Sequence, residues 1–153
     1  MKIPQYVTAE EVKRVCKELK IRDWTRLTTA KVLPGEAKTI LLKVNASKMK
    51  IAREDFRAGL EVELEHGIRF KEANVTSNHP ILTGLIVLAH FKESLDYYKL
   101  LEVAELEGDL VKAVAAGNTE KIKKCYARLA ASRIALSHAE LKRIRANKLK
   151  LPV

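Results

Sequence analysis

The chain has 153 residues, of which 47% are hydrophobic and 31% charged, and its formal net charge is +10. A chain of this length suits one well-buried core, and its composition excludes a disordered protein and a membrane-spanning one. The longest apolar stretch, residues 81–91, is much shorter than the roughly 20 residues that cross a bilayer. We therefore expect a buried helix there, and no membrane as a partner.

The basic charge lies at the two ends of the sequence. Residues 1–60 carry 14 basic and 7 acidic side chains, residues 61–110 carry 4 and 10, and residues 119–153 carry 10 and 2. This polarity favours an anionic partner, whether nucleic acid, an acidic protein surface or the acidic middle of a neighbouring copy. Self-assembly is therefore one expected form of interaction.

Three segments are predicted in the first third of the chain. Thr8 and Glu11 form a capping box that begins a helix, whose apolar stripe is Val12, Val15, Cys16 and Leu19. Residues 22–31 read as a turn or short helix anchored by Trp24 and Leu27. After Pro34-Gly35, residues 36–44 fit a strand or a helix, with the helix favoured, because periodicity cannot choose between them.

The middle and the end of the chain predict long helices. Residues 52–66 form one helix, with Gly67 as its C-terminal stop. Asn78 caps a central helix that runs from Pro80 to Glu107, and Gly108-Asp109 kinks or ends it. Residues 109–116 form another helical segment, which Gly117-Asn118 closes, and Thr119 then caps the last helix.

These elements predict an all-α fold, a single compact helical bundle of about five or six helices. The whole chain, 1–153, is expected to be one domain, with a basic N-terminal helical arm at 1–50, a core unit at 51–118 and a long basic C-terminal helix at 119–153. Residues 1–6 lack the apolar segment of a secretion signal, so we expect a cytoplasmic protein. In that reducing compartment Cys16 and Cys125 are expected to be free, buried thiols.

Several short motifs carry a family resemblance. They are the Glu63-Leu64-Glu65-His66-Gly67 helix end, Asn74-Val75-Thr76, and Ala89-His90-Phe91-Lys92-Glu93 followed by Tyr97-Tyr98. Over about residues 54–101 the chain resembles a small domain family of unknown function found in bacteria and viruses. The resemblance implies a helical unit in which the 63–67 helix end meets the helix of the 89–93 motif. If the protein is viral, its expected location is the virion. The chain departs from the family pattern at His79, where an acidic residue is expected.

The two histidine motifs form the candidate site. Glu63 and His66 share one helix face, as do His90 and Glu93, because each pair is one turn apart. If the two faces meet, these four side chains form a buried polar clasp, a mononuclear zinc or iron site, or a general acid/base pair. The clasp is favoured because His90 lies in an apolar stretch where an imidazole needs a partner, and because no nucleophile or phosphate-binding loop lies nearby in the sequence.

A second candidate site lies along the last helix. Six cationic or imidazole side chains recur at intervals of three, four, seven or ten residues and are separated by Ala131 and Ala135. They are Lys121, Lys124, Arg128, His138, Lys142 and Arg145. The stripe is either an ordinary solvated face or an anion-binding face for nucleic acid or an acidic protein. Without interleaved aromatic residues, any nucleic-acid binding is expected to be led by phosphate contacts.

Together these features predict a non-enzymatic structural or interaction protein that engages an anionic partner. An assembly component such as a virion protein is a specific form of this prediction, by analogy with the resemblance. The alternative is a helical metal-binding protein, or a small metalloenzyme, that uses Glu63, His66, His90 and Glu93.

Overall fold

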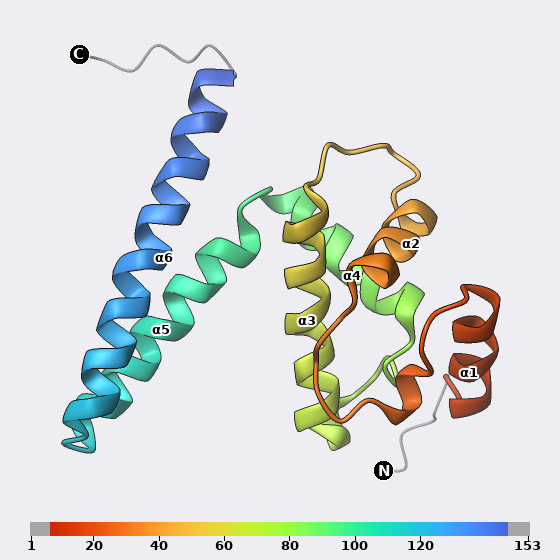
Figure 1. The fold of residues 1–153 in the computed structure, drawn as a ribbon, viewed down its shortest axis with the longest axis horizontal. Coiled ribbons are helices and arrows are strands. Elements are labelled where there is room, and N and C mark those ends of the chain that lie inside the picture. Colours follow the sequence, from red (N-terminus) through yellow and green to blue (C-terminus); the bar gives the residue numbers. More distant parts are fainter. Residues whose placement is uncertain (1–6, 147–153) are drawn as a thin grey trace. The chain divides into compact units, whose positions relative to one another are not determined.

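The computed structural model describes residues 7–146 and contains only helices and connecting segments within that range (Figure 1). The α-helices are α1 (Ala9–Glu18), α2 (Pro34–Val44), α3 (Arg53–Arg69), α4 (Pro80–Glu93), α5 (Tyr97–Ala115) and α6 (Thr119–Ala146). Two short 3₁₀ helices are η1 (Trp24–Arg26) and η2 (Lys71–Ala73). The predicted all-α fold is confirmed, and residues 36–44 belong to a helix.

Contacts divide the chain into two compact units, Met1–Leu95 and Asp96–Val153. The first unit contains α1 to α4, and the second contains α5 and α6. The sequence-based subdivisions at residues 50 and 118 do not coincide with this boundary. Whether the two units behave as one domain stays a prediction.

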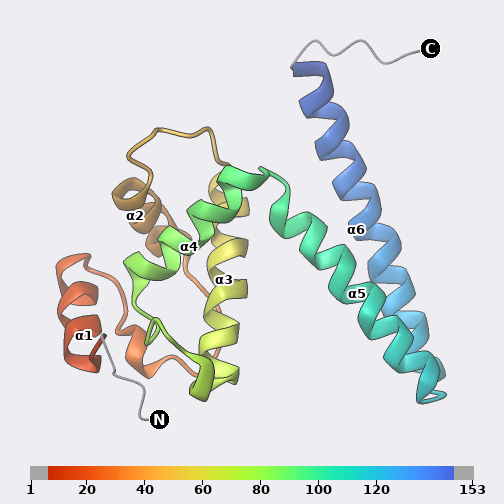
Figure 2. The same ribbon diagram turned by 180° about the vertical axis from the view of Figure 1, so that it is seen from behind.

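In the first unit, α2, α3 and α4 pack against one another, and α1 contacts η1 and α4 (Figure 2). Phe56, Leu60 and Leu64 of α3 are buried, as the spacing of apolar residues predicts. Gly84 of α4 lies where the helices approach closely, because a Cβ atom there would be 2.6 Å from Ile40 Cγ2 of α2. Any side chain at this position would therefore push α4 away from α2.

A buried ion pair joins the segment before α2 to that helix. The Glu36 side chain is 4% exposed and accepts hydrogen bonds from Arg22 Nε at 2.9 Å and Arg22 Nη2 at 2.7 Å. It also accepts from the backbone N–H groups of Arg22 and Leu33. Burial alone would raise the pKa of Glu36, but these hydrogen bonds outweigh it and hold the pKa below its usual value.

Some predicted caps are correct and others lie one residue away. Thr8 Oγ1 accepts from Glu11 N at 3.2 Å as expected, while the Glu11 carboxylate pairs with Arg14. The N-cap of α4 is His79 and not Asn78: its Nδ1 accepts from the N–H groups of the next turn, and burial lowers its pKa, which favours the neutral imidazole that can accept. Asn118, not Thr119, caps α6, because its Oδ1 accepts from the Lys121 N–H.

Two predicted helix ends are wrong. Gly67 does not stop α3, which continues to Arg69. Gly67 is buried, and a Cβ atom at position 67 would be 2.2 Å from Asn78 Oδ1. The long helix from residue 80 to 107 is two helices, because Ser94 has an extended backbone. Gly108 lies inside α5 and does not end a helix. The predicted close at Gly117-Asn118 is correct, because α5 has its C-cap at Ala116 and the φ of +62° at Gly117 suits glycine.

The second unit is an antiparallel helical hairpin in which α5 and α6 lie side by side in both views (Figures 1 and 2). Its buried seam contains Leu106 and Ala113 of α5 and Cys125 and Leu129 of α6. An ion pair between Asp96, just before α5, and Arg143 of α6 joins the helices far from the Gly117 turn. The hairpin thus buries one narrow stripe of each helix.

Both cysteines are free and buried, as expected. No helix within residues 7–146 combines the length and hydropathy needed to cross a membrane. Residues 1–6, on which the absence of a secretion signal was judged, and residues 147–153, the end of the predicted C-terminal helix, lie outside the described residues.

Candidate functional site

Helices α3 and α4 bring the candidate histidines and carboxylates together around Glu63. Its Oε1 lies 3.6 Å from His90 Nε2 on α4, and its Oε2 lies 3.9 Å from His66 Nδ1 on its own helix. Glu93 Oε2 lies 3.8 Å from His90 Nδ1. The Glu63 carboxylate is therefore the group that both imidazoles share, and His90 lies between two carboxylates.

The four side chains differ in exposure. The side chains of Glu63 and His90 are 16% and 27% exposed, whereas those of His66 and Glu93 are 54% and 69% exposed. Screening by water weakens the outer contacts, so the inner contact between Glu63 and His90 dominates. This contact ties α3 to α4, which is what a clasp requires.

Metal coordination would require several of these side chains to converge on one ion. Nitrogen and oxygen ligands of zinc lie about 2.0–2.2 Å from the ion, so neighbouring ligand atoms of a tetrahedral site are roughly 3.4 Å apart. Among the residues that the structure describes, no group of three or more His, Cys, Asp or Glu side chains is arranged to hold a metal ion.

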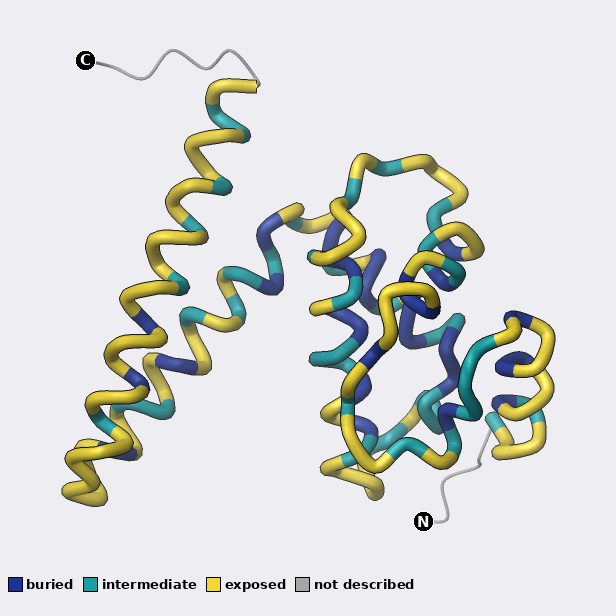
Figure 3. The backbone as a smooth tube through the Cα atoms, in the orientation of Figure 1, coloured by how far each residue is buried: buried dark blue, intermediate teal, exposed yellow. Residues whose placement is uncertain are grey.

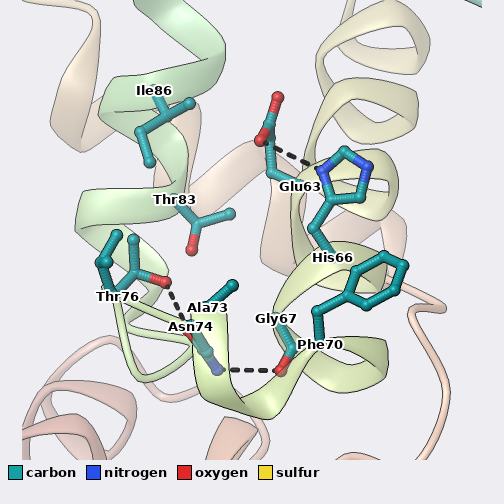
Figure 4. Close-up of a pocket in the computed structure, with 10 residues that line it drawn as sticks. Glu63, His66, Gly67, Phe70, Ala73, Asn74, Thr76, Thr83 and Ile86 are labelled. Atoms are coloured by element: carbon teal, nitrogen blue, oxygen red, sulfur yellow. Dashed lines mark hydrogen bonds and ion pairs between the residues drawn. The ribbon is translucent and has the colours of Figure 1, made fainter.

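A pocket of about 290 Å³ adjoins the clasp between α3, the 70–76 segment and α4 (Figure 4). Glu63 and His66 border it on the α3 side, and Thr83 and Ile86 border it on the α4 side. This volume is at the lower limit for small-molecule sites, which start at about 300 Å³.

Sequence reasoning missed the residues that shape the pocket floor. Asn74 Nδ2 donates to the Gly67 carbonyl and to Asn78 Oδ1, both at 2.9 Å, and Asn74 Oδ1 accepts from Thr76 Oγ1 at 3.2 Å. The loop is thus held to α3 by Asn74, and the close approach requires Gly67. The Asn-x-Thr motif was the available signal, since asparagine and threonine commonly bond to nearby backbone.

Replacing Glu63 by alanine is expected to lower the free energy of unfolding by about 1–2 kcal/mol, because the half-buried His90 loses its inner partner. Glu93→Ala is the matched control and should change the free energy by less than about 0.5 kcal/mol, because its contact is exposed. Urea denaturation followed by circular dichroism measures both. Equal effects in the two variants would contradict a clasp centred on Glu63.

The predicted anion-binding residues form a solvent-exposed face of α6. We call the set Lys121, Lys124, Arg128, His138, Lys142 and Arg145 the basic face. All six residues are exposed, as are Ala131 and Ala135 between them. Arg128 Nη2 lies 3.7 Å from Glu102 Oε1 of α5, and the other five make no ion pair with a described residue.

A family model described as a protein of unknown function (DUF5661) matches residues 12–107, more than half of the chain. The chain belongs to this family. The expected membership of a domain family of unknown function is confirmed, and the match includes the whole 54–101 region. No curated protein and no solved structure matches the chain.

The DUF5661 match covers most of α1, all of α2 to α4 and the first part of α5, and it includes the Glu63 clasp and the adjoining pocket. It does not reach α6. The basic face therefore lies outside the matched segment.

Proposed function

We propose that the protein is a non-enzymatic interaction protein that binds an anionic macromolecule through the basic face of α6. The observation that carries this proposal is the exposure of all six members of the face on one helix of 28 residues. Five of them lack an ion pair with a described residue, so an incoming anion need not displace an internal carboxylate from them.

The geometry of the basic face suits an extended polyanion. At 1.5 Å per residue, the face extends for roughly 36 Å along α6. Ala131 and Ala135 have short side chains, so a partner can approach the helix between the two groups of cations. A duplex phosphate backbone presents charge over this length, and its binding releases counterions.

The chemistry of the basic face favours phosphate contacts over base readout. None of its members is Phe, Tyr or Trp, so we expect phosphate contacts to dominate and sequence selectivity to be weak. An acidic protein surface is the other partner with this chemistry. A cytoplasmic or virion assembly component is the specific form of this proposal, by analogy with the family resemblance of the sequence motifs.

Salt titration tests the proposal directly. With about five phosphate contacts, affinity for short duplex DNA is expected to fall about 500-fold between about 50 and 200 mM salt. Fluorescence anisotropy measures this, and a polyglutamate peptide serves as the probe for an acidic protein partner. Failure of both probes to bind at low salt, or a flat salt response, would contradict the proposal.

A metal-binding protein is the alternative function, and the position of Glu63 beside both imidazoles is what favours it. Zinc or iron bound at Glu63, His66, His90 and Glu93 would require these side chains to move closer together. Metal analysis of protein purified without chelator, compared with His66→Ala/His90→Ala, tests this alternative. One equivalent of metal that the double variant loses would support it, and no bound metal in either protein would exclude it.

A further inference from the structure

A second exposed surface of the hairpin is apolar. On α5, Leu100, Val111 and Val114 are 45%, 68% and 58% exposed. On α6, Tyr126, Ile134 and Leu141 are 63%, 58% and 38% exposed. We call these six residues the apolar face. Exposed residues recur along both helices (Figure 3).

Each half of the apolar face has helical spacing. Leu100, Val111 and Val114 are eleven and three residues apart, and Tyr126, Ile134 and Leu141 are eight and seven apart. At about 100° per residue, these intervals keep the three side chains of each helix within about 80° of one another, on one side of the helix.

An ion pair shows that the two halves lie on the same side of the hairpin. Glu107 is four residues before Val111, and Arg133 is seven residues after Tyr126, so each shares its helix side with the apolar residues. Arg133 Nη2 lies 2.6 Å from Glu107 Oε1. Arg128 of the basic face meets Glu102 of α5 on the other side of the seam. His138 and Arg145 of the basic face border the apolar face instead, because they follow Ile134 and Leu141 by four residues.

We propose that the apolar face is an interface with a second copy of this chain. In this complex two hairpins pack face to face as a four-helix bundle, a symmetric contact in which the same surface is used twice. The inference is independent of the proposed function, because the apolar face and the basic face share no residue.

Charge identifies a second copy as the occupant. The basic face repels itself, whereas Glu107 and Arg133 of the apolar side neutralise each other. In a two-fold arrangement, Glu107 of one copy can also pair with Arg133 of the second copy, and Arg133 of the first with Glu107 of the second. The apolar face is therefore complementary to itself in charge as well as in hydrophobicity.

The area is also sufficient. Six side chains at these exposures present roughly 600 Å² per hairpin, so two copies bury roughly 1,200 Å², the lower limit of a specific interface. A hairpin alone buries only one stripe of each helix, and a second layer supplies the core that the two helices lack. The basic faces then point outward on both sides of the dimer.

The test is the molar mass of the full chain in nuclease-treated samples, measured by light scattering after size exclusion. The proposal expects twice the chain mass of 17.2 kDa. Val111→Glu and Ile134→Glu, made separately, place a charge in the interface and should raise the dissociation constant at least about 100-fold. Both positions are more than half exposed, so the hairpin should keep its helical circular dichroism.

Leu42→Glu is the matched control, because Leu42 is a 74% exposed leucine in the other unit and should leave the dimer intact. High salt separates an apolar interface from association through a bound polyanion: it leaves the first intact and dissolves the second. A monomer of the unaltered chain, a dimer that salt dissolves, or a dimer that survives both glutamate variants would overturn the proposal.

Discussion

Replacing Lys121, Lys124 and Lys142 together by glutamine is expected to weaken binding to duplex DNA about 100-fold at about 50 mM salt. The reason is the loss of three phosphate contacts, which should also make the slope of log affinity against log salt shallower by about three. Fluorescence anisotropy across a salt series measures both quantities. Glutamine and lysine have similar helix propensities, so α6 should remain folded.

The matched control removes the same charge elsewhere. Lys13, Lys17 and Lys38 are exposed residues of α1 and α2, and their replacement by glutamine should change affinity by less than about threefold. Equal losses in the two triple variants would mean that binding follows net charge and not the basic face.

Replacing Glu36 by alanine is expected to lower the free energy of unfolding by about 3 kcal/mol. The substitution removes the acceptor of four hydrogen bonds and leaves the Arg22 guanidinium without its partner in a half-buried position. Urea denaturation measures the change. Glu18→Ala, which breaks an exposed pair with Arg14, is the control and should cost less than about 0.5 kcal/mol.

The contribution of Glu36 should depend on pH in one direction. Because the pKa of Glu36 is lower in the folded state than its usual 4.5, the stabilisation is fully present above pH 4.5. It is lost as the pH falls through the folded-state pKa and the carboxylate is protonated. The stability difference between the native chain and Glu36→Gln should therefore be constant near neutrality and shrink in acid. A difference that persists unchanged in acid would show that packing, and not charge, stabilises this site.

Local sequence was sufficient to predict those features that depend on the periodicity of a single helix. The apolar stripe of α1, with Val12, Cys16 and Leu19 buried, follows from spacing in a single helix. The position of Glu63 and His66 on one face of α3 has the same origin, and so does the exposed spacing of the basic face. These features need no information from residues far along the chain.

Long-range packing explains the wrong helix ends. Glycine at position 67 is a typical signal of a helix stop. In this structure it lies inside α3, where the absence of a Cβ atom leaves room for the Asn78 side chain. The break at Ser94 has no proline or glycine beside it, so nothing local distinguishes it from the interior of a long helix. The cap at His79 was missed because histidine is not among the preferred N-cap residues, although its neutral imidazole accepts from the next turn and burial lowers its pKa in favour of that form.

The sequence by itself determined the all-α class, the amphipathic faces and the candidate histidine and carboxylate pairs, because these depend on helical periodicity and composition. Only the tertiary structure decided that Glu63 is the carboxylate shared by both imidazoles and that Glu36 is buried against Arg22. Only the structure places the two stripes of the apolar face on one side of the hairpin, through the contact between Glu107 and Arg133. The physical reason is that burial and pairing depend on how helices pack, and packing brings together residues that local sequence cannot relate.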